Sequence, residues 1–200
     1  MPDSFAALAT PLHQLLRWLA DEKIPHVVIG GVAASQLGTP RATADIDVLA
    51  LLADDEAIHG LLVSAAAYGF RPRRPDAEQF ARLNRVLLLE HQDTAVGADI
   101  SLGLLPFEHE VVSRAITVRI GALVIPLPTV EDLIILKGVA HRPRDLQDIA
   151  ALVERNPVLD SARIVKVLSE FAEVLDMPEI LASVKKIIAP YSATSGLSSA

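Results

Sequence analysis

Residues 27–51 read VVIGGVAASQLGTPRATADIDVLAL, and this stretch decides the fold. The apolar run 27–29 predicts a short buried strand that stops at Gly30 and Gly31, and residues 32–37 are typical of a helix. Two successive glycines let the backbone approach a ligand closely. Their N–H groups, together with the start of the helix, favour an anion. The segment therefore predicts a strand–turn–helix unit that can hold a phosphate group.

A second strand is predicted over residues 45–49, where acidic and apolar residues alternate. Because residues two apart on a strand point to the same side, Asp45 and Asp47 face one way while Ile46 and Val48 face the core. Two neighbouring carboxylates raise each other's pKa unless a cation lies between them. Mg²⁺ (or Mn²⁺) prefers such oxygen ligands, together with substrate phosphates. Beside a phosphate-holding turn, the pair predicts a phosphoryl-transfer site.

Asp99 is the candidate for a third carboxylate. It lies in the middle of residues 96–102, which read VGADISL and predict another strand. Aspartate is depleted in strand interiors, and a two-metal site needs a ligand or a base on the acceptor side. The alternative is an exposed aspartate on an edge strand. Asp93 is a poorer candidate, because it lies in a predicted turn.

A glycine pair followed by an Arg-x-Thr-x-Asp-Ile-Asp pattern resembles the signature of the polymerase-β-like nucleotidyltransferase superfamily, and most of all its AbiEii-type toxin branch, which includes the MenT-like toxins. The matching residues are Gly30, Gly31, Arg41, Thr43, Asp45, Ile46 and Asp47. The resemblance covers residues 24–152. It implies nucleotide binding by Gly30, Gly31, Arg41 and Thr43. It also implies a metal-binding and catalytic role for Asp45, Asp47 and Asp99, with a nucleoside triphosphate (NTP) as substrate.

A second motif of the same superfamily resembles residues 137–149, which read KGVAHRPRDLQDI. By this resemblance Lys137 contacts the triphosphate as a catalytic and nucleotide-binding residue, and Asp148 orients the lysine or an active-site loop. The residues themselves are consistent with this, because a lysine among apolar neighbours must reach water or meet an anion. The alternatives are structural. Asp145 can complement a helix dipole, and Asp148 can pair with an arginine one turn earlier.

The fold class expected from these patterns is α/β: a small mixed β-sheet of the nucleotidyltransferase type with a C-terminal helical portion. A chain of 200 residues that is 51% hydrophobic can bury one sizeable core. We expect a single nucleotidyltransferase domain over residues 1–188, with an α/β catalytic core at 24–126 and a helical portion at 129–188. The Ser- and Ala-rich tail 189–200 is expected to be disordered.

Three further expectations concern single elements. Thr10 should cap a first helix with Pro11 at its first position. Residues 71–76 should form a loop, and residues 83–90 a strand. The last helix should cover residues 177–188.

Composition excludes several classes of function. There is no cysteine, so disulfides, zinc–thiolate sites and thiol catalysis are excluded. The net charge of −7 argues against broad non-specific binding of nucleic acid. The chain shows neither a membrane-length apolar run nor a signal peptide, so we expect a cytoplasmic protein without membrane contact. Five arginines nevertheless cluster in the sequence and form either a solvated face or an RNA-binding surface: Arg71, Arg73, Arg74, Arg82 and Arg85.

The acceptor hydroxyl is the open question. The resemblance implies transfer of a nucleoside monophosphate to the 3′ end of tRNA, by a toxin of a toxin–antitoxin system with an antitoxin protein as partner. An adenylyltransferase acting on a small molecule such as an antibiotic is the alternative, and a protein acceptor is a further one. A non-catalytic nucleotide-binding module is disfavoured, because an unused Asp45–Asp47 pair would only add repulsion.

Overall fold

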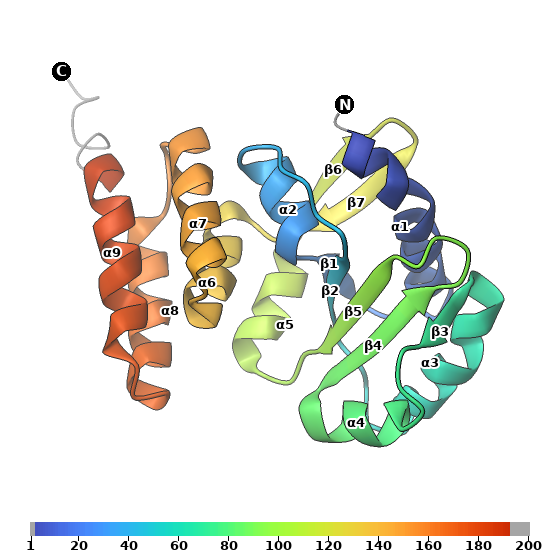
Figure 1. Cartoon of the computed structure of the whole chain (residues 1–200). Helices are drawn as coiled ribbons and strands as arrows, with labels where there is room; N and C mark the ends of the chain where they lie inside the picture. Colours follow the sequence, from blue (N-terminus) through green and yellow to red (C-terminus); the bar gives the residue numbers. More distant parts are fainter. Residues whose placement is uncertain (1–2, 193–200) are drawn as a thin grey trace. The chain divides into compact units, whose positions relative to one another are not determined.

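The computed structural model describes residues 3–192, and Figure 1 shows the arrangement of the elements within each part. The described chain forms two compact units. Unit 1 comprises the chain up to Val32 together with Arg41–Pro128. Unit 2 comprises Ala33–Pro40 together with the chain from Thr129 onward.

Unit 1 is built on a five-stranded mixed sheet with the strand order β1-β2-β5-β4-β3. Its strands are β1 (His26–Val28), β2 (Ile46–Ala50), β3 (Phe70–Pro72), β4 (Val86–His91) and β5 (Gly97–Leu102). Only the β2–β5 pair is parallel within this sheet. The strands β6 (Ile116–Ile120) and β7 (Leu123–Leu127) form a separate antiparallel hairpin.

The helices of unit 1 are α1 (Asp3–Asp21), α3 (Ala57–Ala65), the 3₁₀ helix η1 (Ala66–Tyr68), α4 (Ala77–Asn84) and α5 (Pro106–Ser113). The boundary between the two units falls within α2 (Gly30–Leu37). Unit 2 adds α6 (Val130–Ala140), α7 (Pro143–Arg155), α8 (Ser161–Val174) and α9 (Pro178–Ser192). None of the helices within residues 3–192 combines the length and apolar character of a transmembrane span. The expected α/β class, with a mixed sheet and C-terminal helices, is confirmed.

The two faces of the five-stranded sheet differ in chemistry. One face is a fully buried apolar layer, made by Ile46, Val48, Leu87, Leu89, Ala98 and Ile100. Alternation along each strand sends the intervening residues to the opposite face. Asp47, Leu88 and Asp99 lie there side by side, because the register pairs Asp47 with Asp99 and Leu88 with Asp99. One face of the sheet therefore makes the core, and the other carries the acidic residues.

An aromatic cluster anchors α1 to the β3 end of unit 1. Trp18, which is 0% exposed, stacks on Phe70 with 6.0 Å between ring centroids and on Tyr68 with 6.3 Å. Its indole N–H donates to Ser64 Oγ at 2.9 Å. A buried indole with a satisfied N–H is a strong anchor, so α1, α3 and β3 are held together at this point.

Two helices of unit 2 begin at polar residues whose side chains cap them. Thr129 caps α6 by accepting from the backbone N–H of Asp132, and Asp160 caps α8 by accepting from that of Arg163. Asp132 is itself 0% exposed, and Arg163 binds its carboxylate at 2.9 Å. Apolar side chains of all four helices make the core of this unit: Leu133, Ile134, Ile149, Leu152, Ile164, Leu168, Ile180 and Val184.

The predicted start of the first helix is wrong. Pro11 lies inside α1, which is already helical at Asp3, instead of at its first position. Proline removes one helical hydrogen bond. Leu8 and Leu12 are both buried on either side of it, so the apolar stripe continues through the proline and packing outweighs the lost bond.

Two other segments differ from expectation. Residues 77–84 form α4, and the strand starts only at Val86, because Arg85 adopts a left-handed conformation (φ 54°) that ends the helix. Leu83, which suggested a strand, is 75% exposed. The predicted loop 71–76 contains the end of β3. Helix α9 continues to Ser192, beyond the expected end at 188, and residues 193–200 of the expected disordered tail lie outside the described residues.

We expect Trp18→Ala to lower the free energy of unfolding by about 3–5 kcal/mol, because it removes a fully buried aromatic side chain and leaves a cavity. Denaturation with urea would measure the change. Val63→Ala is the control, since Val63 is 67% exposed on α3 and its truncation should cost less than about 0.5 kcal/mol. Equal effects of the two substitutions would contradict the anchoring role of Trp18.

Candidate active site

The parallel pairing of β2 with β5 brings two of the predicted site acids together. Asp47 on β2 pairs directly with Asp99 on β5, and both side chains are half-buried. Side chains of directly paired residues lie on the same face of a sheet, only about 5 Å apart at Cβ. Asp45 lies just before β2 and is exposed.

Gly30 makes the turn that lies against Asp47. Its φ is +59°, and a Cβ atom at this position would lie only 1.9 Å from Asp47 Oδ2. The backbone N–H of Gly31 points to the same oxygen at 3.5 Å, and the N–H of Ile29 donates to the Asp47 carbonyl at 2.8 Å. Helix α2 starts at Gly30, two residues earlier than predicted. The first N–H groups of this helix therefore lie beside a carboxylate of the candidate site.

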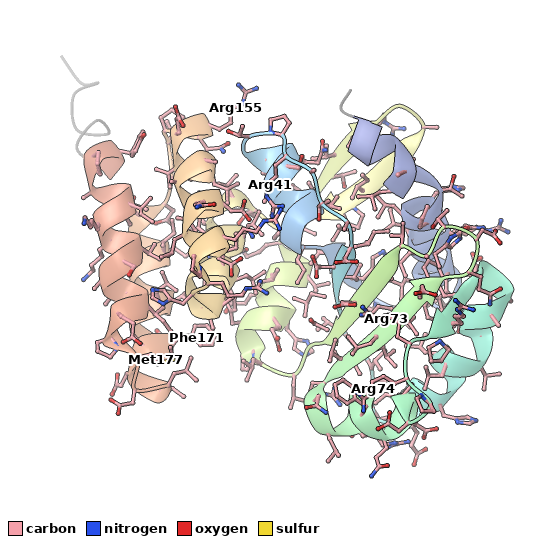
Figure 2. All side chains as sticks on the ribbon, in the orientation of Figure 1. Arg41, Arg73, Arg74, Arg155, Phe171 and Met177 are labelled. Atoms are coloured by element: carbon pink, nitrogen blue, oxygen red, sulfur yellow. The ribbon has the colours of Figure 1, made fainter. Side chains whose placement is uncertain are left out.

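The remaining residues of the first motif gather at Gly31. A Cβ atom there would lie 2.3 Å from Thr43 Oγ1 and 3.4 Å from a guanidinium nitrogen of Arg41, which is labelled in Figure 2. The Thr43 hydroxyl donates to the Asp45 carbonyl at 3.3 Å. The segment between α2 and β2 is thus folded back onto the glycine turn.

Arg73 also lies at the candidate site, although no motif in the sequence points to it individually. Its guanidinium donates to Asp99 Oδ1 and forms an ion pair with it. A Cβ atom at Gly97 would lie 2.5 Å from Asp45 Oδ1 and 3.5 Å from Arg73 Nη1, so both side chains border the space that Gly97 leaves open. The only sequence signal for Arg73 was its membership of the arginine cluster.

The electrostatics of Asp99 reflect a crowded acidic site. Burial raises its pKa, the Arg73 guanidinium lowers it, and the neighbouring carboxylates of Asp47 and Asp45 raise it again. The net direction is upward. Three carboxylates that act on one another in this way repel each other unless cations offset their charge.

The donor set fits a hard divalent cation. Within the part of the chain that the structure describes, no group of three or more metal-ligating side chains is already gathered around one point. Mg²⁺, however, is commonly bound by one or two carboxylates with waters and substrate phosphates completing its shell. Asp45 and Asp47 supply carboxylate oxygens beside the glycine turn, and Asp99 supplies a third carboxylate that now pairs with Arg73.

Acidic partners accompany all five clustered arginines. The ion pairs are Arg71–Glu90, Arg73–Asp99, Arg74–Asp76, Arg82–Glu78 and Arg85–Asp55. Arg74 also lies over the ring of Phe80, 4.3 Å from its centroid. Figure 2 labels Arg73 and Arg74. Since a carboxylate lies against every one of these guanidinium groups, the cluster offers less positive charge to a polyanion than its sequence suggests.

Unit 2 contains the second motif as a buried ionic cluster. Lys137 is 5% exposed, and its Nζ lies 3.2 Å from Asp145 Oδ1 and 2.6 Å from Asp148 Oδ2. Arg142 Nε donates to the other oxygen of Asp145 at 2.6 Å. Lys137 therefore meets anions inside the protein instead of reaching water. Asp145, for which a helix-dipole role was one alternative, belongs to this cluster as well.

A family model described as "nucleotidyltransferase of unknown function (DUF6036)" matches residues 5–179. The chain belongs to this family. A comparison with curated protein sequences gives no match. The DUF6036 match confirms the expected enzyme class, a nucleotidyltransferase. It also supports the polymerase-β-like superfamily, while the AbiEii-type toxin branch stays a prediction.

Solved structures share the fold of this DUF6036 protein. The solution structure of the antibiotic-resistance factor ANT(2″)-Ia has a TM-score of 0.60 at 15% identity, over 88% of this chain and 96% of that one. The crystal structure of ANT(2″)-Ia with adenylyl-2″-tobramycin gives 0.55 at 17%, over 83% and 97%. An antigenic nucleotidyltransferase-like protein from Paracoccidioides brasiliensis gives 0.52 at 15%, over 92% and 93%. At these identities the likeness is one of fold.

We expect Gly30→Ala to weaken nucleotide and Mn²⁺ binding strongly, because the new methyl group would displace the Asp47 carboxylate. Gly121→Ala is the matched control. Gly121 has the same φ of +59°, but a Cβ atom there meets nothing within 4 Å. Both variants should lose about 1–2 kcal/mol of stability from the left-handed conformation, and only Gly30→Ala should lose binding in titration calorimetry. Equal binding by the two variants would contradict the role assigned to Gly30.

The buried cluster of unit 2 should make stability depend on pH. Burial alone would raise the pKa of Asp145, but Arg142 and Lys137 bring it below its usual value. A depressed pKa in the folded state adds stability above the unfolded pKa of about 4, and this stability is lost as the pH falls through the folded pKa. We expect Asp145→Asn to lower the free energy of unfolding at pH 7 by about 1–3 kcal/mol.

Urea denaturation at pH 7 and pH 3 would test this expectation. The difference between wild type and Asp145→Asn should shrink at pH 3, because this pH lies below the unfolded pKa and the unfolded chain then binds a proton at Asp145 more readily than the folded protein does. Glu154→Gln removes an exposed carboxylate from the same helix and should have little effect at either pH. A difference for Asp145→Asn that is equal at both pH values would show that its charge does not stabilise the fold.

Proposed function

We propose that this chain transfers a nucleoside monophosphate from an NTP to an acceptor hydroxyl, with Mg²⁺ or Mn²⁺ as cofactor. The observation that carries the proposal is the pairing of Asp47 with Asp99 on adjacent strands, directly against a left-handed glycine at the start of a helix. Carboxylates for a cation and backbone N–H groups for a phosphate then lie within one site.

Each acid has a separate task in this proposal. Asp45 and Asp47 hold the divalent cation, and Asp99 serves either as a further ligand or as the base that accepts the proton of the attacking hydroxyl. A bound divalent cation supplies charge neutralisation on the phosphates. The acceptor oxygen forms a bond to the α-phosphorus, the bond between this phosphorus and the bridging oxygen to the β-phosphate breaks, and pyrophosphate leaves.

Nucleotide binding is assigned to the glycine turn and the residues around it. Gly30 and Gly31 leave room for phosphates, and Arg41 and Thr43, which lie against Gly31, bind the nucleotide. For Lys137 the resemblance implies a contact with the triphosphate. In support of the companion role of Asp148, its carboxylate holds the lysine ammonium at 2.6 Å within unit 2. We infer that residues 1–188 work as one nucleotidyltransferase domain.

A small-molecule hydroxyl is the acceptor that we favour. One structure that shares the fold is that of the antibiotic-resistance factor ANT(2″)-Ia in complex with adenylyl-2″-tobramycin. Each of the five clustered arginines lies against an acid of this chain, which reduces the net positive charge that the cluster offers to a polyanionic acceptor. Transfer to the 3′ end of tRNA, an antitoxin partner and a cytoplasmic location stay predictions from the resemblance and the composition.

We expect Asp47→Asn to reduce nucleotide transfer by at least about 100-fold without unfolding the protein. Removing a direct metal ligand should cost more activity than removing a residue that only hydrogen-bonds to such a ligand. The assay combines each labelled NTP and Mg²⁺ with aminoglycoside antibiotics in one series and total tRNA in another. Asp93→Asn, in the exposed turn before β5, is the control and should stay active.

The possible outcomes test the assignment of the active site and the identity of the acceptor separately. Label on an antibiotic that depends on Asp47 supports the proposal in full. Label on tRNA keeps the mechanism and replaces the acceptor. A folded Asp47→Asn protein with wild-type activity would overturn the assignment of the site.

A further inference from the structure

We propose that Arg73 is an internal counter-ion of the acidic site and competes with the divalent cation for Asp99. In this view the guanidinium stabilises the three carboxylates while no cation is bound, and it must release Asp99 when one binds. The inference rests on the proposed function, since it concerns metal binding at the same site. It adds a residue that sets the metal affinity of the site.

A backbone hydrogen bond fixes the position of the Arg73 main chain. Arg73 directly follows β3, and its backbone N–H donates to the Leu88 carbonyl at 2.9 Å. Leu88 pairs with Asp99, which pairs with Asp47. The backbone of Arg73 is therefore tied to the strand next to Asp99, and only its side chain would have to move for the ion pair to open.

The guanidinium is also close to a second acid of the site. Asp45 Oδ1 and Arg73 Nη1 both border the space above Gly97. The Arg73 guanidinium donates its hydrogen bond to Asp99 Oδ1. One positive charge thus lies among the carboxylates of Asp45, Asp47 and Asp99; burial raises the pKa of Asp99, and the repulsion from the other two adds to this. A cation in this place offsets part of that repulsion, which is what a bound metal ion would otherwise do.

Exposure distinguishes this ion pair from the one in unit 2. The side chains of Arg73 and Asp99 are 33% and 34% exposed, whereas those of Lys137 and Asp148 are 6% and 7% exposed. A partly solvated ion pair is weak, because water competes for both charges, and it can open at little cost. Breaking a buried pair would leave an uncompensated charge. The Arg73–Asp99 ion pair can therefore open and let another cation replace Arg73, whereas the ion pairs of Lys137 stay closed.

The chemistry assigned to Asp99 favours this exchange. The guanidinium occupies Oδ1, so part of the acceptor capacity of the carboxylate is used while the ion pair is closed. A divalent cation brings twice the charge of Arg73 and prefers carboxylate oxygen. Binding of the cation and release of Asp99 by Arg73 are thus linked, and removing Arg73 should favour the cation.

Arg71 provides a matched control. It precedes Arg73 by two residues, so both side chains lie on the same face of the sheet. Arg71 pairs with Glu90, which no part of the proposed mechanism uses. Arg71→Met and Arg73→Met remove the same charge and leave the same side chain, but only the second removes the partner of Asp99.

The experiment titrates the metal-free full chain with Mn²⁺. The electron paramagnetic resonance signal of the free ion measures how much Mn²⁺ is bound. We expect Arg73→Met to bind Mn²⁺ about fivefold more tightly than wild type, which is near the upper range for loss of a competing exposed ion pair. Arg71→Met should stay within about twofold of wild type. The rise in melting temperature on adding Mn²⁺ should also be larger for Arg73→Met than for the other two proteins.

Two results would overturn the inference. Wild-type or weaker Mn²⁺ affinity in Arg73→Met would show that Arg73 supports Asp99 permanently, and equal tightening in both variants would show a general charge effect. If Arg73→Met does not fold, Arg73→Gln replaces it with the same expectation. Asp47→Asn tests the proposed function separately, because wild-type Mn²⁺ binding by that variant would overturn the metal site itself.

Discussion

The parallel pairing of β2 with β5 is the constraint on which the candidate site depends. It holds the Asp47 carboxylate beside that of Asp99, where the two repel each other. Neighbouring residues provide the space and the positive charge that this arrangement needs. Gly30 leaves the space that the Asp47 carboxylate occupies, Gly97 leaves that of Asp45, and Arg73 supplies a positive charge. A sheet that is apolar on its other face provides the rigid support for this concentration of charge.

Charge is handled differently in the two units. In unit 1 the ion pair of Asp99 is partly solvated and can open, which suits the cation site that we propose there. In unit 2 Lys137 is enclosed by Asp145 and Asp148, so its partners are permanent. The two aspartates therefore determine where the ammonium group of Lys137 points.

The choice of acceptor depends on charge in the same way. Five clustered arginines would attract a nucleic acid, but each already binds an acid of this chain, and the protein carries a net charge of −7. Neutralising the phosphates of a long polyanion needs basic side chains that are available to it. The small-molecule acceptor that we propose makes no such demand.

The sequence by itself determined the enzyme class and the mixed α/β fold, and it predicted the residues of the first motif, because glycine pairs and alternating acids act locally. It did not reveal that helix α4 precedes β4, since Leu83 looks like a strand residue until its exposure is known. Nor could it pair Arg73 with Asp99, 26 residues away, or place Lys137 between two carboxylates. Those contacts exist only through strand register and helix packing, which bring distant residues together, and so only the tertiary structure decided them.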